Sequence, residues 1–78
     1  MRKHLAQLCD GEAGTVVEIE GGHGLRSRLV GLGIREGARL HVVCAPRGRG
    51  PTVVTVGHGR VAIGHGMAQK IVMEIQTP

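Results

Sequence analysis

The sequence predicts a mainly β fold: a small, closed or nearly closed barrel of about five short strands with one or two short helices. Three observations carry this prediction. The chain has 78 residues, so residues 1–78 are expected to form one domain. Fourteen of them are glycine, which favours tight turns. Short runs rich in Val and Ile lie between these glycines, and closure would remove sheet edges that so small a domain could not cover.

Alternation of apolar and polar residues locates the strands. In the first predicted strand, Val17 and Ile19 are expected to share the core face. In the second, Cys44 is expected to follow Leu40 and Val42 into the core. The predicted strands are residues 15–20, 39–45, 52–56, 60–63 and 71–76, with a single helical turn near 67–69.

A change of period predicts a short helix over residues 24–32. Leu25, Leu29 and Leu32 lie at i, i+4 and i+7 and therefore share one helix face. Gly33 stands where a left-handed glycine commonly ends a helix. Because a helix of about two turns is unstable alone, it must be held by packing.

No arrangement of residues points to an enzyme. Ser27 is the only serine and has no G-x-S-x-G motif around it. Cys44 is expected in the core, where a thiol behaves as a small hydrophobe. No two acidic residues share a helix face, and no phosphate-binding glycine motif has the required spacing. The sequence therefore predicts a protein that binds a partner and requires no cofactor.

Histidines offer a candidate metal site. The chain has five, and His58 and His65 stand between glycines at the two ends of a short predicted strand. Glycine neighbours leave the backbone free to orient an imidazole. Because no H-x₃-H or C-x₂-C spacing occurs, we expect at most weak binding of a divalent ion such as Fe²⁺ or Zn²⁺, within the chain or across a homo-oligomer. The alternative interpretation is that both are exposed loop histidines.

Charge and composition bear on location and partners. The formal net charge of +4 suits an acidic protein face, a lipid surface or nucleic acid. Arg47 and Arg49 form a basic loop, but small nucleic-acid-binding barrels stack bases on aromatic rings, and this chain has none. Nucleic acid is therefore not expected, although a small basic nucleic-acid-binding barrel is kept as an alternative.

The expected compartment is the cytoplasm. No apolar run approaches the roughly 20 residues of a membrane span or the run that a secretion signal needs, so direct membrane insertion is not expected. Cys9 and Cys44 do not form the framework of a disulfide-rich secreted domain, and are expected to be free thiols in a reducing compartment.

The segment from Arg28 to Gly37 has the pattern R-L-x-x-L-G-[IL]-x-x-G. Together with matching positions elsewhere, this segment makes the whole chain resemble the ferrous iron transport protein A (FeoA) family. The resemblance implies an SH3-like barrel without known catalytic residues. The other matching positions are Leu5, Leu8, Gly11, Gly14, Pro51, Val54, Val56, Ala62, Ile63, Ala68 and Ile71.

The resemblance also implies an accessory or regulatory protein of bacterial ferrous iron uptake. The partner it implies is the cytoplasmic G-protein region of the large membrane transporter of that system (FeoB). We expect the contact surface on the helix and its flanks, because apolar residues beside arginine suit a protein interface. The alternative function is a free-standing form of the SH3-like module of iron-dependent repressors. The alternative interpretation of this surface is that its leucines belong to the core and its arginines are only solvated. The expected contact residues are Leu25, Arg26, Arg28 and Leu32.

Overall fold

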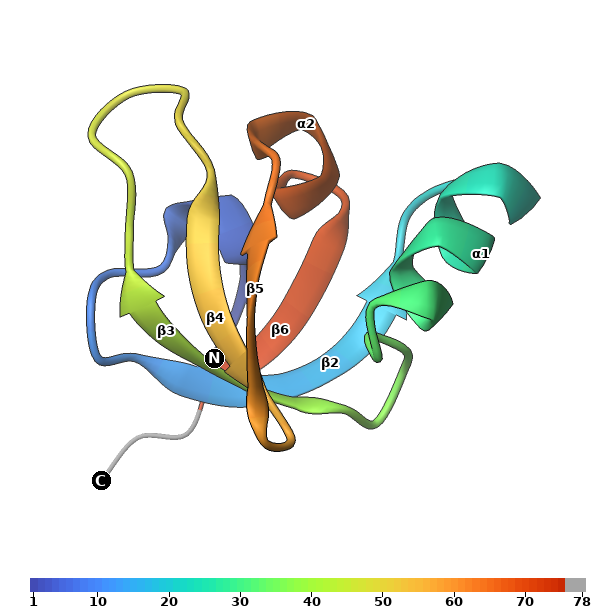
Figure 1. Ribbon diagram of the computed structural model, residues 1–78, viewed down its shortest axis with the longest axis horizontal. Helices are drawn as coiled ribbons and strands as arrows, with labels where there is room; N and C mark the ends of the chain where they lie inside the picture. Colours follow the sequence, from blue (N-terminus) through green and yellow to red (C-terminus); the bar gives the residue numbers. More distant parts are fainter. Residues whose placement is uncertain (76–78) are drawn as a thin grey trace.

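The chain forms an antiparallel six-stranded sheet that curls into a small barrel (Figure 1). The computed structural model describes residues 1–75, so Gln76, predicted as the end of the last strand, lies outside the described residues. The strand order is β1-β6-β2-β3-β4-β5. The elements are β1 (Arg2–His4), the 3₁₀ helix η1 (Leu5–Gln7), β2 (Ala13–Ile19), α1 (His23–Gly31), β3 (Arg39–Cys44), β4 (Thr52–Val56), β5 (Gly59–Ile63), α2 (His65–Ala68) and β6 (Ile71–Ile75).

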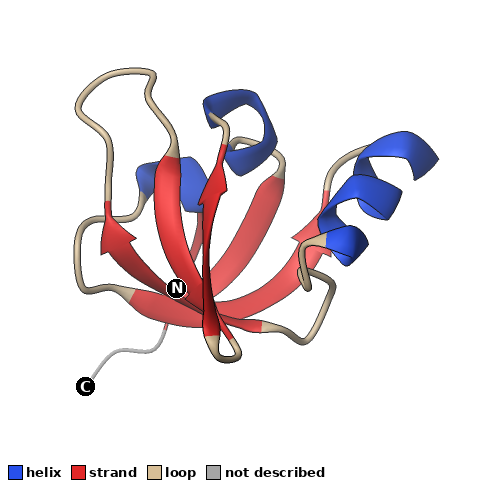
Figure 2. Ribbon diagram, viewed as in Figure 1, coloured by secondary structure: helices blue, strands red, loops and turns tan. Residues whose placement is uncertain are grey.

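Of the helices, η1 and α2 lie toward the end of the barrel opposite the turn between β4 and β5, and α1 lies at its side (Figure 2). None of those in residues 1–75 combines the length and the apolar character that crossing a membrane requires. The mainly β prediction is confirmed, with one strand more than expected.

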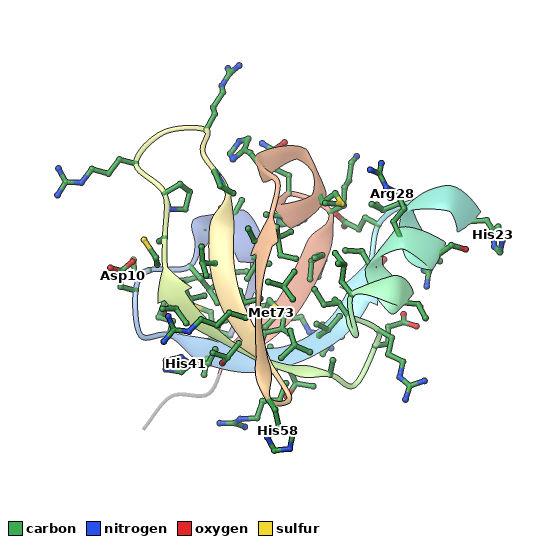
Figure 3. All side chains as sticks on the ribbon, viewed as in Figure 1. Asp10, His23, Arg28, His41, His58 and Met73 are labelled. Carbon is green, nitrogen blue, oxygen red and sulfur yellow. The ribbon has the colours of Figure 1, made fainter. Side chains whose placement is uncertain are left out.

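The core is built from aliphatic side chains. Ile71 and Met73 of β6 are fully buried and Ile75 nearly so, which confirms the predicted inward face of this strand. Met73 lies near the centre of the barrel (Figure 3). The buried apolar residues are Leu5, Leu8, Val16, Ile19, Leu29, Ile34, Leu40, Val42, Val54, Ile63, Ala68, Ile71, Met73 and Ile75.

A bulge in β2 overturns the predicted inner face of that strand. Val16 pairs with Met73 and Glu18 pairs with Val72, so the register shifts at Val17. The extra residue breaks the two-residue period. As a result Val16 is buried with Ile19, whereas Val17, predicted to face the core, is only half-buried.

A second irregularity overturns the prediction for Cys44. Val42 pairs with Val54, but Cys44 pairs with Val53, so the register of β3 against β4 shifts between them. Cys44 is therefore exposed at the strand end, and Cys9 is exposed too; both are free thiols. The prediction that Cys44 is buried, and is unreactive for that reason, is wrong.

Sequence periodicity did not predict β1 and η1. A three-residue strand shows no period, and its partner β6 lies at the other end of the sequence. The carboxylate of Glu74 on β6 accepts a 2.6 Å hydrogen bond from the Met1 ammonium and a 3.3 Å bond from Arg2 Nε. The ammonium, and then the guanidinium, hold the pKa of Glu74 below its ordinary value of 4.5. These contacts attach β1 to the sheet edge.

Helix α1 ends as predicted, at a left-handed glycine. Gly33 has φ +85°, and its N–H donates to Val30 O at 2.9 Å. The N–H of Ile34 donates to Leu29 O at 2.8 Å, which completes a Schellman motif. Ile34 and Leu29 are both fully buried, so the motif fixes the end of the helix on the core.

Two glycines provide a test of the packing. A Cβ on Gly14, which is buried in β2, would overlap the backbone carbonyl oxygen of Glu74. Gly14→Ala should therefore lower the free energy of unfolding by about 3 kcal/mol or more. A Cβ on Gly24 in α1 would meet nothing within 4 Å. Gly24→Ala should raise that free energy by about 0.5 kcal/mol. Urea unfolding measures both, and equal effects would contradict the close approach at Gly14.

Acid should expose the contribution of Glu74. Because its folded-state pKa is lowered, the carboxylate stabilises the native state at neutral pH, and this stabilisation is lost as the pH falls below about 4.5. We expect the urea midpoint of the wild type to fall more between pH 7 and pH 3 than that of Glu74→Gln. The difference should be small, because the side chain is 43% exposed. Parallel curves would show that the pair does not stabilise the fold.

Candidate partner-binding site

Helix α1 projects from the side of the barrel beyond the end of β2 (Figure 1). Leu29 is its fully buried anchor. Leu25 is half-buried and packs over Gly21, where a Cβ would collide with it. A helix this short can bury only one side against the barrel, so much of its surface is left to solvent.

The predicted leucine face is only partly a core face. Leu32 follows the last helical residue and is 38% exposed. At 100° per residue, Leu25, Arg28 and Leu32 lie on one side of α1. We call these three residues the α1 surface. Val30 is 54% exposed, but lies on the other side of the helix; the sequence analysis did not single it out.

The two arginines predicted at this site have different roles. Arg26 Nη2 donates to Ile19 O at 2.9 Å, and Arg26 Nη1 lies 3.6 Å from Glu36 Oε1. Arg26 therefore ties α1 to the end of β2 and to the turn after the helix. Arg28 takes part in none of the ion pairs within residues 1–75, and Figure 3 shows it extending from α1 on the side toward α2. Its guanidinium is available to a partner.

The structure does not bring His58 and His65 together within the chain. His58 lies in the β4–β5 turn and His65 begins α2, at opposite ends of β5. Five strand residues span about 17 Å, too far for one metal ion. No group of three or more His, Cys, Asp and Glu in residues 1–75 is placed to hold a metal. Within the described part of one chain, His58 and His65 therefore cannot bind the same ion, and sharing between two copies stays a prediction.

His65 instead lines a pocket with residues that sequence spacing could not connect. The pocket, of about 370 Å³, lies between η1 and α2. His65 Nδ1 is buried without a hydrogen-bond partner in the described residues. Across the pocket, His4 Nε2 is 2.7 Å from Glu20 Oε1. The lining residues are His4, Ala6, Gln7, His65 and Gln69.

Comparison with known proteins decides the family. A model of the FeoA domain matches residues 3–75. The chain belongs to the FeoA family. A Methanocaldococcus jannaschii protein that bears the name of an Fe(2+) transport protein A is 37% identical over 70 residues, which cover 90% of this chain and 83% of that protein.

Solved structures confirm the SH3-like barrel. A crystal structure of an iron uptake regulatory protein (FeoA) matches with a TM-score of 0.92 at 36% identity, covering 97% of this chain and 100% of that one. The zinc-complexed FeoA of Stenotrophomonas maltophilia, described as a prokaryotic SH3 domain protein, has a TM-score of 0.76 at 27% identity, covering 95% of this chain and 89% of that one. A manganese-dependent transcriptional repressor has a TM-score of 0.87 at 25% identity, covering 96% of this chain but 42% of the repressor.

The different roles of Arg26 and Arg28 can be tested by measuring the stability of the two alanine variants. Arg26→Ala removes the hydrogen bond to Ile19 O and should lower the free energy of unfolding by about 1 kcal/mol. Arg28→Ala should change it by less than about 0.5 kcal/mol, because Arg28 has no ion pair to lose within the described chain. Thermal and urea unfolding of the two variants test this, and a larger loss for Arg28→Ala would assign it the structural role.

Proposed function

We propose that this FeoA protein is a non-catalytic regulator of ferrous iron uptake that binds the cytoplasmic G-protein region of a FeoB-type membrane transporter. Family membership connects the chain with ferrous iron transport. The observation that carries the binding role is α1 itself, which projects from the side of the barrel (Figure 1), with Leu32 exposed and Arg28 in none of the ion pairs of residues 1–75.

The chemistry of the α1 surface suits a protein interface. Leu25 and Leu32 supply apolar area that a partner can cover. Arg28 supplies a planar set of donors for a carboxylate or a backbone carbonyl of the partner. Since Leu29 and the Schellman motif fix the helix, these side chains are presented on a rigid element, and binding would order little of the chain.

In this proposal the protein works in the cytoplasm and needs no cofactor of its own. Fe²⁺ is the cargo of the transporter. Weak binding of Fe²⁺ or Zn²⁺ by His58 or His65, singly or shared between copies, would be secondary to the protein contact.

Co-purification with the cytoplasmic part of a cognate FeoB-type transporter tests the proposal. The wild type should associate, and Arg28→Glu should weaken the association by about tenfold or more, because it places a negative charge against the carboxylate or carbonyl oxygen that would accept from the guanidinium. Arg47→Glu makes the same charge change in the distant β3–β4 loop and should leave the association unchanged.

A second pair of variants tests which side of the helix is used. Leu32→Asp should weaken association, whereas Val30→Asp, on the other side of α1, should not. Each variant is first checked for native stability, since a helix that no longer docks would lose the partner for a trivial reason. No association of the wild type under any nucleotide or metal condition would overturn the proposal, and salt-sensitive oligonucleotide binding instead would favour the nucleic-acid alternative.

A further inference from the structure

A groove with a basic lining crosses the outer face of the barrel over β3 and β4. It consists of two hollows that share Arg39 and Gly57. The first, of about 540 Å³, lies between residues 33–39 and the end of β4. The second, of about 330 Å³, is completed by His41 and Thr55. We call the two together the basic groove.

Strand register extends this groove onto β5. His41 pairs with Thr55, and Thr55 pairs with Arg60, so the three side chains form a row on one face of the sheet. Strands lie about 4.8 Å apart, which puts the Cα atoms of His41 and Arg60 roughly 10 Å apart. Arg39 lies about 7 Å from His41 along β3. All three of these basic residues are exposed.

The positive charge of the groove is not neutralised within the described chain. Arg35, Arg39 and Arg60 form none of the ion pairs in residues 1–75. The acidic side chain of the lining, Glu36, lies 3.6 Å from Arg26 Nη1 of α1. Three guanidinium groups are therefore held by the sheet and its preceding turn without an acidic partner among the described residues.

An acidic residue, Glu74, lies on β6, two strands away from β3. Thr15 of β2 pairs with Arg39 on one side and with Glu74 of β6 on the other, so Glu74 is two strands away from Arg39. Its carboxylate is already bound by the Met1 ammonium and Arg2. Glu74 therefore leaves the charge of the groove available to an external ligand.

We propose that the basic groove binds an extended acidic segment of a protein partner. Alternate side chains of an extended chain recur about every 7 Å on one side, which matches the spacing of Arg39 and His41 along β3, and Arg60 lies beside this row across the sheet. Guanidinium groups bind carboxylates through paired hydrogen bonds. A nucleic acid suits the groove less well, because the chain has no aromatic residue on which a base could stack.

Titration of the ¹⁵N-labelled full chain with an eight-residue peptide of alternating glutamate and serine tests this site. Amide resonances of residues 35–41 and 55–60 should shift, and the affinity should fall with added salt. Arg39→Glu/Arg60→Glu should weaken binding by about tenfold or more. Arg47→Glu/Arg49→Glu lowers the net charge equally, but lies in the loop outside the groove, and should change the affinity by less than about twofold.

The contrary outcomes are distinct. No shift with the peptide, or equal weakening by the two charge-matched double variants, overturns the proposal. So does tighter binding of an eight-nucleotide oligothymidylate, or displacement of the peptide by inorganic phosphate at equal concentration. If Arg39→Glu/Arg60→Glu does not fold, Arg39→Gln/Arg60→Gln replaces it. Arg28→Glu should leave peptide affinity unchanged, so failure here is separate from failure of the proposed transporter contact.

Discussion

The close approach of β2 and β6 at Gly14 is the constraint on which the rest of the barrel depends. With no aromatic ring to fill the interior, the barrel must be narrow for Leu, Ile and Val side chains to meet across it. The backbone of β6 reaches this distance only where β2 lacks a Cβ. β6 also holds β1 on its other edge, and its pairing with β2 continues to Ile19 opposite Ile71, so β6 positions the end of β2 from which α1 projects.

Local patterns predicted much of this fold. β4 and the inward face of β6 follow a two-residue period that no bulge interrupts, and Gly33 ends α1 because a left-handed position there requires glycine. Register was not predictable in the same way. The bulges at Val17 and before Cys44 are set by the pairing partners of those strands, and β1 exists only because β6 lies beside it.

The candidate binding surfaces also depend on contacts that the sequence pattern does not reveal. Arg26 and Arg28 are indistinguishable in sequence, yet one guanidinium is bound to Ile19 O and the other is unpaired in the described chain. The sequence drew attention to Arg47 and Arg49 in the β3–β4 loop, whereas the basic groove combines residues from three strands and two turns. The α1 surface ends at Leu32 and the lining of the groove begins at Gly33, so the two proposed surfaces adjoin each other in the sequence.

The central position of β6 also has a consequence for how the protein is made. Residues 71–75 leave the ribosome after every other element, yet both β1 and β2 need them as a neighbour. Until then the growing chain can form the local β3–β4–β5 meander, but it cannot complete the barrel. Completion of the barrel is therefore expected to wait until β6 has left the ribosome, with the edges of β1 and β2 unprotected in the nascent chain until then.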